Sequence, residues 1–345
     1  MIKLSQENNF DHIRLLLALG VFFFHTAELT QLAQFSFIKD LFSASVAVHS
    51  FFIVSGFLIF MSYERSSSLK SYFTKRFKRI APGYITVILL AFIFLSFIST
   101  LSLVDYFTSS ESWQYLLANL STLGFVHLTL PGVFTENYNT SVNGALWTIK
   151  VEVMFYLSVP LIAYFYHWLG TTKTLITVFL LSLLYYYTMA SLAEQLQNPL
   201  FIVLQRQLPG QMMLFTSGAL LYYHHKTFLK YKHLIFVFAV IGYLIEKYIP
   251  FYPLYAISLS IIVIYLATAI FYLGHIAKYG DLSYGIYIWH FPLIQTFIAL
   301  HFFDKAPVLA FTVLTLIVLF VSCISWHIIE KPFLSKKSHY IKENP

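Results

Sequence analysis

The sequence predicts an all-α membrane protein, a bundle of about ten transmembrane helices with the N-terminus and the C-terminus in the cytoplasm. Its 345 residues are 58% hydrophobic and only 11% charged, whereas charged residues make up about a quarter of a soluble globular chain. Apolar stretches long enough to cross a hydrocarbon core of about 30 Å recur along the chain. Neither an internal repeat nor a long linker is visible, so we expect residues 1–345 to form a single domain.

Ten stretches have the hydropathy expected of a membrane span. They lie near residues 12–30, 44–62, 82–104, 145–166, 174–192, 208–223, 234–249, 253–273, 283–301 and 308–328. A further segment, residues 113–128, is apolar enough for a re-entrant or interfacial helix. We do not count it as a span, because doing so would place the later basic loops outside the cytoplasm.

Basic residues set the predicted orientation, because Lys and Arg concentrate in cytoplasmic loops. With the N-terminus inside, most of the 22 Lys and Arg residues fall in cytoplasmic segments, including the terminal Lys3, Lys336, Lys337 and Lys342. The outer loops hold only Lys39, Arg206, Lys247 and Lys305. The longest outer connection, residues 105–143, has a length typical of functional loops and would suit a cover over a site open to the outside.

Charge and cysteine content exclude other classes of protein. The formal net charge of +7 is explained by the asymmetric topology, and no isolated basic run predicts nucleic-acid binding. The single cysteine, Cys323, excludes an intrachain disulfide and a CxxC site, and we expect no metal. Because Arg14 and His25 interrupt the first apolar run and no small-residue cleavage site follows, we expect this segment to be retained rather than removed as a signal peptide.

Arg14 and His25 are the most informative pair in the first predicted span. In a helix the eleven-residue step between them turns through about 1100°, some 20° past three full turns, so both side chains share a face. The same step rises about 16.5 Å, which puts His25 near the middle of the membrane if Arg14 lies at its surface. An imidazole at that depth is a functional candidate; a hydrogen bond between packed helices is the structural alternative.

A basic cluster precedes the third predicted span in the sequence KRFKRIAP. Arg76 and Arg79 are three residues apart and would share a face of a short helix, beside Lys75 and Lys78. Paired guanidinium groups suit phosphate binding through charge-assisted hydrogen bonds. The alternative is an anchor that contacts anionic lipids.

Two further motifs place polar residues in apolar helices. In LWTIKVEVMFY, Glu152 and Tyr156 are four apart and share a face, whereas Lys150 points about 200° away from Glu152. An intramembrane carboxylate is a functional candidate, with a buried ion pair to an arginine as the alternative. In the second span, Gly56 permits close helix approach, and we expect structural roles for Ser55 and Gly56.

The segment LSYGIYIWHFP opens the ninth predicted span. Ser283, Tyr287 and His290 follow at steps of four and three, which makes one polar stripe on an otherwise apolar helix. Such a stripe lines a cavity or holds helices together by hydrogen bonds.

Taken together, these motifs resemble the bacterial acyltransferase-3 family, integral membrane enzymes that O-acylate cell-surface carbohydrates. The resemblance rests on six motifs in order: Arg14 with His25, FFIVSGFLI at 51–59, KRFKRIAP at 75–82, LWTIKVEVMFY at 146–156, LSYGIYIWHFP at 282–292 and IEKPF at 329–333. One departure is that family members commonly carry two consecutive acidic residues in the tryptophan motif, whereas Val153 follows Glu152 here.

The resemblance implies a location in the bacterial cytoplasmic (inner) membrane and a cytoplasmic acyl-CoA donor, most often acetyl-CoA. Its phosphates would contact Arg14, Lys75, Arg76 and Arg79. The thioester would lie near His25, acting as a general base or, alternatively, as a covalently acylated nucleophile, with Glu152 as the second catalytic candidate. The acceptor, a surface carbohydrate or lipid-linked saccharide, would contact Trp147, Tyr156, Ser283, Tyr287 and His290. Because some members carry a fused extracytoplasmic domain, a separate extracytoplasmic or glycan-assembly partner is also implied.

Two other functions are compatible with the same residues. A transporter or flippase for an anionic or lipid-linked solute would use Arg14, Glu152 and His290 along its path. A membrane scaffold for polysaccharide assembly would tolerate replacement of His25. A transporter does not explain why phosphate-binding arginines cluster on one cytoplasmic loop beneath a mid-membrane histidine.

Overall fold

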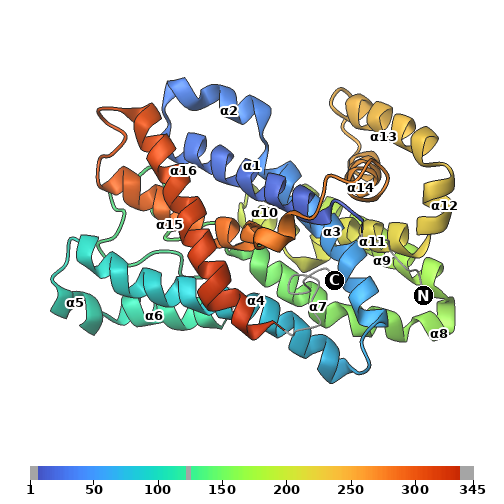
Figure 1. Ribbon diagram of the computed structural model, residues 1–345, viewed down its shortest axis with the longest axis horizontal. Coiled ribbons are helices and arrows are strands. Elements are labelled where there is room, and N and C mark those ends of the chain that lie inside the picture. Colours follow the sequence, from blue (N-terminus) through green and yellow to red (C-terminus); the bar gives the residue numbers. More distant parts are fainter. Residues whose placement is uncertain (1–6, 122–125, 335–345) are drawn as a thin grey trace. The chain divides into compact units, whose positions relative to one another are not determined.

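The computed structural model describes residues 7–121 and 126–334, and across these ranges it contains helices and no strand (Figure 1). The predicted all-α class is therefore confirmed. Four of the basic residues used to predict the orientation, Lys3, Lys336, Lys337 and Lys342, lie outside the described residues.

Sixteen α-helices follow one another in this part of the chain. The first eight are α1 (Phe10–Thr30), α2 (Ser36–Leu41), α3 (Ala44–Glu64), α4 (Leu69–Phe94), α5 (Leu103–Thr108), α6 (Ser110–Leu120), α7 (Trp147–Tyr164) and α8 (Tyr166–Leu169). The second eight are α9 (Thr171–Leu196), α10 (Leu200–Gln205), α11 (Leu208–Tyr223), α12 (His225–Lys230), α13 (Lys232–Glu246), α14 (Tyr252–Thr268), α15 (Leu282–Ala299) and α16 (Pro307–Ile324).

Six helical stretches of the described chain are long and apolar enough to cross a membrane. They are Phe10–Thr30, Ala33–Glu64, Leu69–Ile98, Trp147–Tyr164, Thr171–Leu196 and Pro307–Phe333. The other four predicted spans correspond to α11, α13, α14 and α15, which are helical but shorter or less apolar. The predicted re-entrant or interfacial segment 113–128 overlaps α6, which has only 11 residues, too few to cross the hydrocarbon core. Residues 122–125 lie outside the described chain.

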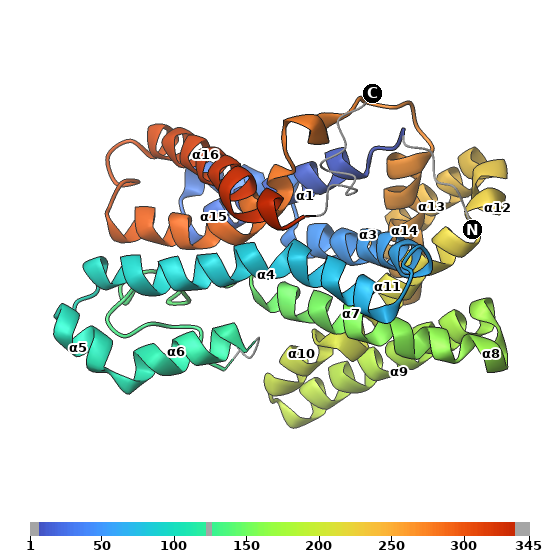
Figure 2. The same ribbon diagram turned by 60° about the horizontal axis from the view of Figure 1, so that its bottom comes forward.

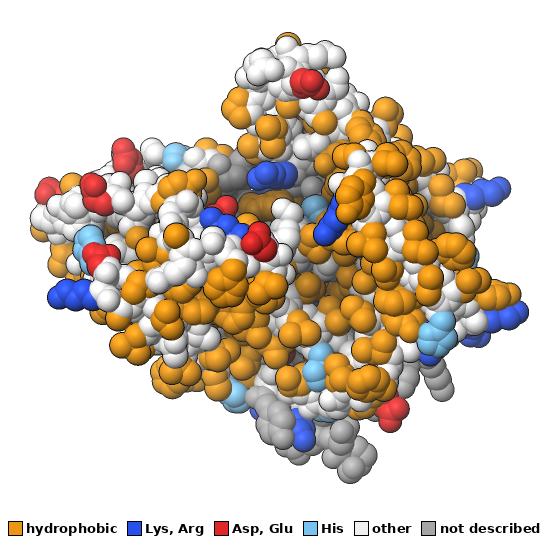
Figure 3. All heavy atoms as spheres, turned by 90° about the horizontal axis from the view of Figure 1, so that it is seen from above, with side chains coloured by type: hydrophobic (Ala, Val, Ile, Leu, Met, Phe, Trp, Pro, Cys, Tyr) orange, Lys and Arg blue, Asp and Glu red, His pale blue; other side chains and the backbone are white. Residues whose placement is uncertain are grey.

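The surface matches a protein surrounded by lipid. Hydrophobic side chains cover much of the face drawn in Figure 3. On the predicted spans, Leu161, Leu184 and Phe320 are 62%, 64% and 66% exposed. Exposed apolar area of this extent is stable in hydrocarbon but not in water, so the chain is a multi-pass membrane protein.

The described chain divides into two compact units, which we treat separately. Unit 1 comprises residues 7–13, 48–73 and 151–275 of the described chain. Unit 2 comprises residues 14–47, 74–121, 126–150 and 276–334.

Close backbone contact between α3 and α11 organises unit 1. A Cβ atom on Gly56 would lie 1.8 Å from the carbonyl oxygen of Phe215, and one on Gly218 would lie 2.0 Å from that of Ile53. Only glycine fits at these crossings, which confirms the structural role predicted for Gly56. The Phe155 and Phe215 rings stack at 4.2 Å between centroids beside them.

In unit 2, α15 and α16 lie side by side in both ribbon views (Figures 1 and 2). Gly285 of α15 lies against Ser322 of α16, whose Cα would be 3.0 Å from an added Cβ. Phe311 of α16 contacts Phe22 of α1 with ring centroids 6.1 Å apart. Three helices thus bury apolar faces against one another.

Prolines inside two helices leave carbonyl groups that side chains satisfy. Pro292 has no N–H for the carbonyl of Ile288, four residues earlier, and Asn143 Nδ2 donates to that oxygen at 2.9 Å. Pro160 likewise frees the carbonyl of Tyr156, which accepts from the Tyr72 hydroxyl at 3.1 Å. Each bond satisfies a backbone group that lipid cannot.

The Asn143 contact belongs to a wider attachment between α15 and the segment that precedes α7. Gln295 Nε2 donates to the carbonyl of Ser141 at 2.9 Å, and Asn137 Nδ2 donates to Gln295 Oε1 at 3.0 Å. Gln295 and Asn137 are buried. This segment is therefore fixed to the helix that carries the predicted polar stripe.

Candidate functional site

His25 and His290 form a direct pair in unit 2. His25 Nδ1 lies 2.9 Å from His290 Nε2, and the two rings are nearly parallel, 9° apart, with centroids separated by 5.2 Å. His290 is fully buried and His25 is partly buried. The rings of His25 and Phe291 form a T-shaped contact with centroids 5.4 Å apart. The mid-span imidazole therefore faces a second imidazole inside the protein.

The remaining members of the polar stripe on α15 are also hydrogen-bonded to protein groups. Tyr287 Oη lies 2.6 Å from Thr148 Oγ1, and Ser283 donates through its hydroxyl to Asp281. Ser283 and Tyr287 are buried, as is His290. The Tyr287–Thr148 contact joins two packed segments, one of the two roles that the sequence left open for this stripe, whereas the Ser283–Asp281 contact is local.

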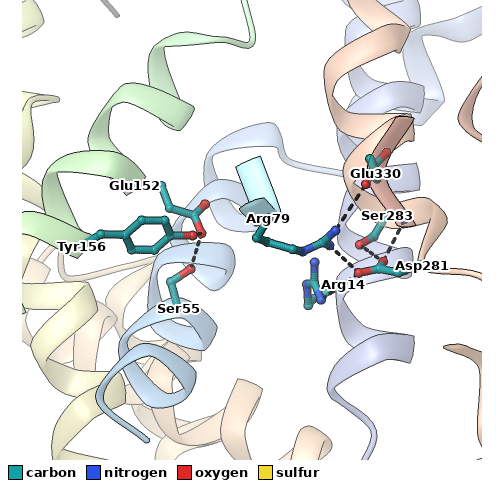
Figure 4. A network of polar contacts seen from close by, with 8 residues as sticks. All are labelled: Arg14, Ser55, Arg79, Glu152, Tyr156, Asp281, Ser283 and Glu330. Atoms are coloured by element: carbon teal, nitrogen blue, oxygen red, sulfur yellow. Dashed lines mark hydrogen bonds and ion pairs between the residues drawn. The ribbon is translucent and has the colours of Figure 1, made fainter. Parts of the chain in front are cut away.

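A charged network lies in the same unit and contains two of the predicted phosphate-binding residues (Figure 4). Arg14 Nη1 donates to Asp281 Oδ2 at 3.1 Å, and Arg79 Nη2 donates to the same oxygen. The other Arg79 nitrogen, Nη1, donates to Glu330 Oε2 at 3.2 Å. Ser325 Oγ completes the set by donating to Glu330 Oε1 at 2.9 Å.

Pairing makes this network possible, because the two carboxylates are only 3% and 2% exposed. Burial alone would raise the pKa of Asp281, but the charges of Arg14 and Arg79 and two hydrogen bonds from Ser283 outweigh it and lower the pKa to about 2. Two guanidinium groups thereby meet two carboxylates, which removes the cost of an isolated buried charge. Arg14 thus forms an ion pair with the carboxylate of Asp281.

A local π-helix brings Glu330 into the network. Residues Ser325–Glu330 form this wider turn directly after α16. Residues five apart point about 140° away from each other in an α-helix, whereas the i to i+5 spacing of a π-helix places them one above the other. Ser325 and Glu330 are five apart and hydrogen-bonded, so the π-helix sets the direction of Glu330.

The predicted basic cluster is helical. The sequence placed it in a loop before a span starting at residue 82, but α4 begins at Leu69 and includes it, with Pro82 inside the helix. Lys75 is exposed and Arg76 and Arg79 are partly buried. The shared face predicted for Arg76 and Arg79 follows from the continuous helix.

The second catalytic candidate, Glu152, belongs to unit 1. Tyr156 donates through its hydroxyl to Glu152 Oε1, and Ser55 Oγ donates to the same oxygen at 3.3 Å (Figure 4). The face shared by Glu152 and Tyr156 is confirmed, and both of these hydrogen bonds come from neutral hydroxyl groups. Trp147, in unit 2, is the first residue of α7 and is partly buried.

The structure thus brings together three sets of predicted residues: His25 with His290, Arg14 with Arg79 through Asp281, and Glu152 with Tyr156. Sequence reasoning missed Asp281, Glu330, Thr148 and Ser325 as partners. Asp281 had a local signal, since an Asp directly before a predicted helix is a preferred N-cap, and it caps α15 by accepting from the Ser283 N–H.

These features define the class as an all-helical, multi-pass membrane protein with a histidine pair and a compensated charge network among its helices. Residues 7–327 match the family described as "Acyltransferase domain". The chain therefore belongs to the acyltransferase-3 family and is an acyltransferase.

Two relatives illustrate the relationship. An "O-acetyl transferase" of Shigella phage Sf6 is 25% identical over 344 residues, which cover 97% of this chain and 98% of that protein. "Nodulation protein 10" of Rhizobium leguminosarum bv. viciae is 31% identical over 166 residues, 46% of this chain and less than half, 44%, of that protein. No solved structure matches the chain.

Proposed function

We propose that this protein is a membrane O-acyltransferase that moves an acyl group, acetyl in the first instance, from cytoplasmic acetyl-CoA to a hydroxyl group of an extracytoplasmic or lipid-linked surface carbohydrate. The observation that carries the proposal is the pairing of His25 with His290. His25 lies on α1, the helix that also bears Arg14. The family membership and the O-acetyl transferase relative support the reaction type. The carbohydrate acceptor rests on the family resemblance.

The proposed topology has ten spans, with both termini in the cytoplasm of a bacterial inner membrane. Four helices that are shorter or less apolar, α11, α13, α14 and α15, would complete the six long apolar ones. The distribution of Lys and Arg supports this orientation. In this proposal residues 1–345 act as one acyltransferase domain and work with an extracytoplasmic or glycan-assembly partner.

In the proposed mechanism His25 is the general base. Its neutral imidazole accepts the proton of the acceptor hydroxyl while that oxygen attacks the thioester carbonyl. The tetrahedral intermediate collapses, the C–S bond breaks, and the CoA sulfur leaves as a thiol with the proton from His25. The products are an ester and free CoA. An acyl-His25 intermediate is the rival route, in which the imidazole itself attacks the thioester.

Donor binding is assigned to the basic residues of α4 and α1. Lys75 and Arg76 would meet the phosphates of CoA directly. Arg14 and Arg79 already contact carboxylates, but a guanidinium carries five N–H donors, so each can bind phosphate while keeping its partner. Asp281 and Glu330 would then hold the two guanidinium groups in a fixed orientation for the donor.

The acceptor side is assigned to Trp147 and Tyr156, with Glu152 as the second catalytic group. Tyr156 shares a hydrogen bond with Glu152, so one residue of this pair can position the other. Ser283 and Tyr287 are buried and hydrogen-bonded to protein groups. Their part in acceptor binding would therefore be to hold α15 in place.

Purified protein in lipid nanodiscs with radiolabelled acetyl-CoA tests the proposal. We expect His25-dependent release of CoA, which rises when an acceptor glycan is added, and a matching mass shift in surface glycans from cells that express the chain. His301→Ala is the matched control, because His301 is an exposed histidine paired only at the surface with Asp304. CoA release that is the same in wild type and His25→Ala would contradict the enzyme and favour a transporter or scaffold.

Trapping separates the two mechanisms. Incubation with labelled acetyl-CoA and no acceptor, followed by mass spectrometry of peptides, yields unmodified His25 if it is a general base. Acetylated His25 under these conditions would instead establish the covalent route.

A further inference from the structure

We propose that His290 is a positioning residue that fixes the tautomer of His25, so that Nε2 of His25 carries the lone pair used as the base. This inference rests on the proposed function and assigns His290 a role other than the acceptor binding expected from the sequence. It is carried by a chain of two hydrogen bonds that ends on a backbone carbonyl.

The carbonyl group of Ile286 sets the direction of both hydrogen bonds. His290 Nδ1 lies 3.0 Å from the oxygen of Ile286, and a carbonyl oxygen only accepts. His290 Nδ1 must therefore carry the hydrogen. Because a neutral imidazole has one N–H, His290 Nε2 is left as an acceptor.

The same logic fixes the next ring. His25 Nδ1 lies 2.9 Å from His290 Nε2, so His25 Nδ1 must donate to it. The hydrogen of a neutral His25 is then on Nδ1, and its Nε2 is unprotonated. A further proton on either ring would place a charge among apolar helices, which is costly, so both rings are neutral in the resting protein.

The surroundings hold His290 in this orientation. Its ring is fully buried and lies at an angle to the rings of Phe22 and Tyr287, with centroids 6.3 Å and 6.0 Å away. A flip of the ring would break both hydrogen bonds at once inside this packing. His290 can therefore act as a fixed acceptor, as a carboxylate does behind the histidine of other catalytic pairs.

Both nitrogens of His290 are thereby engaged within the protein. Nδ1 donates to Ile286 and Nε2 accepts from His25, which leaves neither for an acceptor sugar. Two other histidines provide a contrast: His49 and His233 contact the hydroxyl groups of Tyr255 and Tyr265. A hydroxyl donates or accepts, so these contacts do not fix a tautomer.

Two substitutions at one position test the inference. His290→Gln retains a side-chain oxygen that can accept from His25 Nδ1–H, whereas His290→Leu fills similar space without an acceptor. We expect kcat of the Leu variant to fall by roughly 10² to 10⁴-fold with the KM for acetyl-CoA within about twofold of wild type. The Gln variant should keep kcat within about tenfold of wild type. His233→Leu, which removes a histidine–tyrosine contact in unit 1, should leave both parameters unchanged.

A spectroscopic measurement reports the tautomer directly. In protein labelled with 15N-histidine and embedded in lipid, the signal lost in His25→Gln identifies His25. We expect that signal to report a protonated Nδ1 and an unprotonated Nε2 in wild type and in His290→Gln, and the opposite tautomer or a mixture in His290→Leu. This readout does not depend on turnover.

The outcomes separate the inference from the proposed function. Equal losses of kcat in the Gln and Leu variants, or an unchanged His25 signal in the Leu variant, would overturn the role of His290. Wild-type kcat in His290→Leu would do the same. If His25→Ala itself retains CoA release, it is the proposed function that fails.

Discussion

Within unit 2, α1 contacts the α15 segment at two points, once through neutral side chains and once through charged ones. At one point His25 meets His290, two neutral rings whose hydrogen bond has a fixed direction. At the other, Arg14 meets Asp281 in a network of four charged groups with Arg79 and Glu330. The neutral pair leaves one nitrogen of His25 available for proton transfer, whereas the charged network is balanced within itself. We propose that the first contact serves chemistry and that the second stabilises the fold and helps to bind the donor.

The largest expected effect comes from the neutral contact. His25→Ala should reduce acyl transfer by roughly 10² to 10⁴-fold or more, since it removes the proposed base, while membrane insertion and thermal stability stay close to wild type. Initial rates on purified protein and a melting curve in the same detergent measure both. A variant that loses activity only because it no longer folds would erase the distinction between the two contacts.

The next largest effect comes from the charged contact. Asp281→Asn should lower the free energy of unfolding by about 3–5 kcal/mol, because it leaves two largely enclosed guanidinium groups, 14% and 12% exposed, short of a carboxylate. The shift in melting temperature of the purified protein measures it. Asp304→Asn is the control: its ion pair with His301 is exposed, and such pairs contribute about 0–1 kcal/mol. Equal shifts for the two variants would contradict a buried network.

Acid should reveal the same network in the wild type. Asp281 has an ordinary pKa of 3.8 that the folded protein lowers to about 2. The stabilisation is complete above about pH 4 and is lost as the pH falls from about 4 to 2, a change of roughly 2 kcal/mol. Melting temperatures measured down this pH range should fall less steeply for Asp281→Asn than for wild type. Parallel curves would show that Asp281 is not the group responsible.

The smallest expected effect sharpens the role of Arg14. Arg14→Lys keeps the charge but loses the planar fork of donors, so the KM for acetyl-CoA should rise by about tenfold with little change in kcat. Steady-state kinetics with varied donor measure it. An unchanged donor dependence would confine Arg14 to the contact with Asp281.

Much of the fold was predictable because it depends on local pattern. Apolar stretches predicted helices, and the steps between residues predicted which side chains share a face, as for Glu152 with Tyr156. The close approach at Gly56 also followed from a small residue in an apolar helix. Four predicted spans proved shorter or less apolar than hydropathy windows indicated.

The partners of the site residues were not predictable in the same way. His25 and His290 are 265 positions apart, and periodicity within each helix says which way a side chain points but not what it meets. Arg79 was assigned to phosphate because its neighbours in sequence are basic, whereas its contacts in space are the acidic Asp281 and Glu330. The π-helix that turns Glu330 toward Arg79 has no signal in an apolar pattern of α-helical period.

The proline two residues after His290 has a mechanical consequence. Because Pro292 opens one rung of α15, Asn143 is anchored to the backbone of Ile288, and Asn137 and Gln295 secure the same segment a turn further on. Moving residues 137–143 away from α15 would break the hydrogen bonds of three buried amide side chains at once. This segment and α15, which carries His290, must therefore move as one rigid piece. Any motion that admits a substrate has its hinge elsewhere.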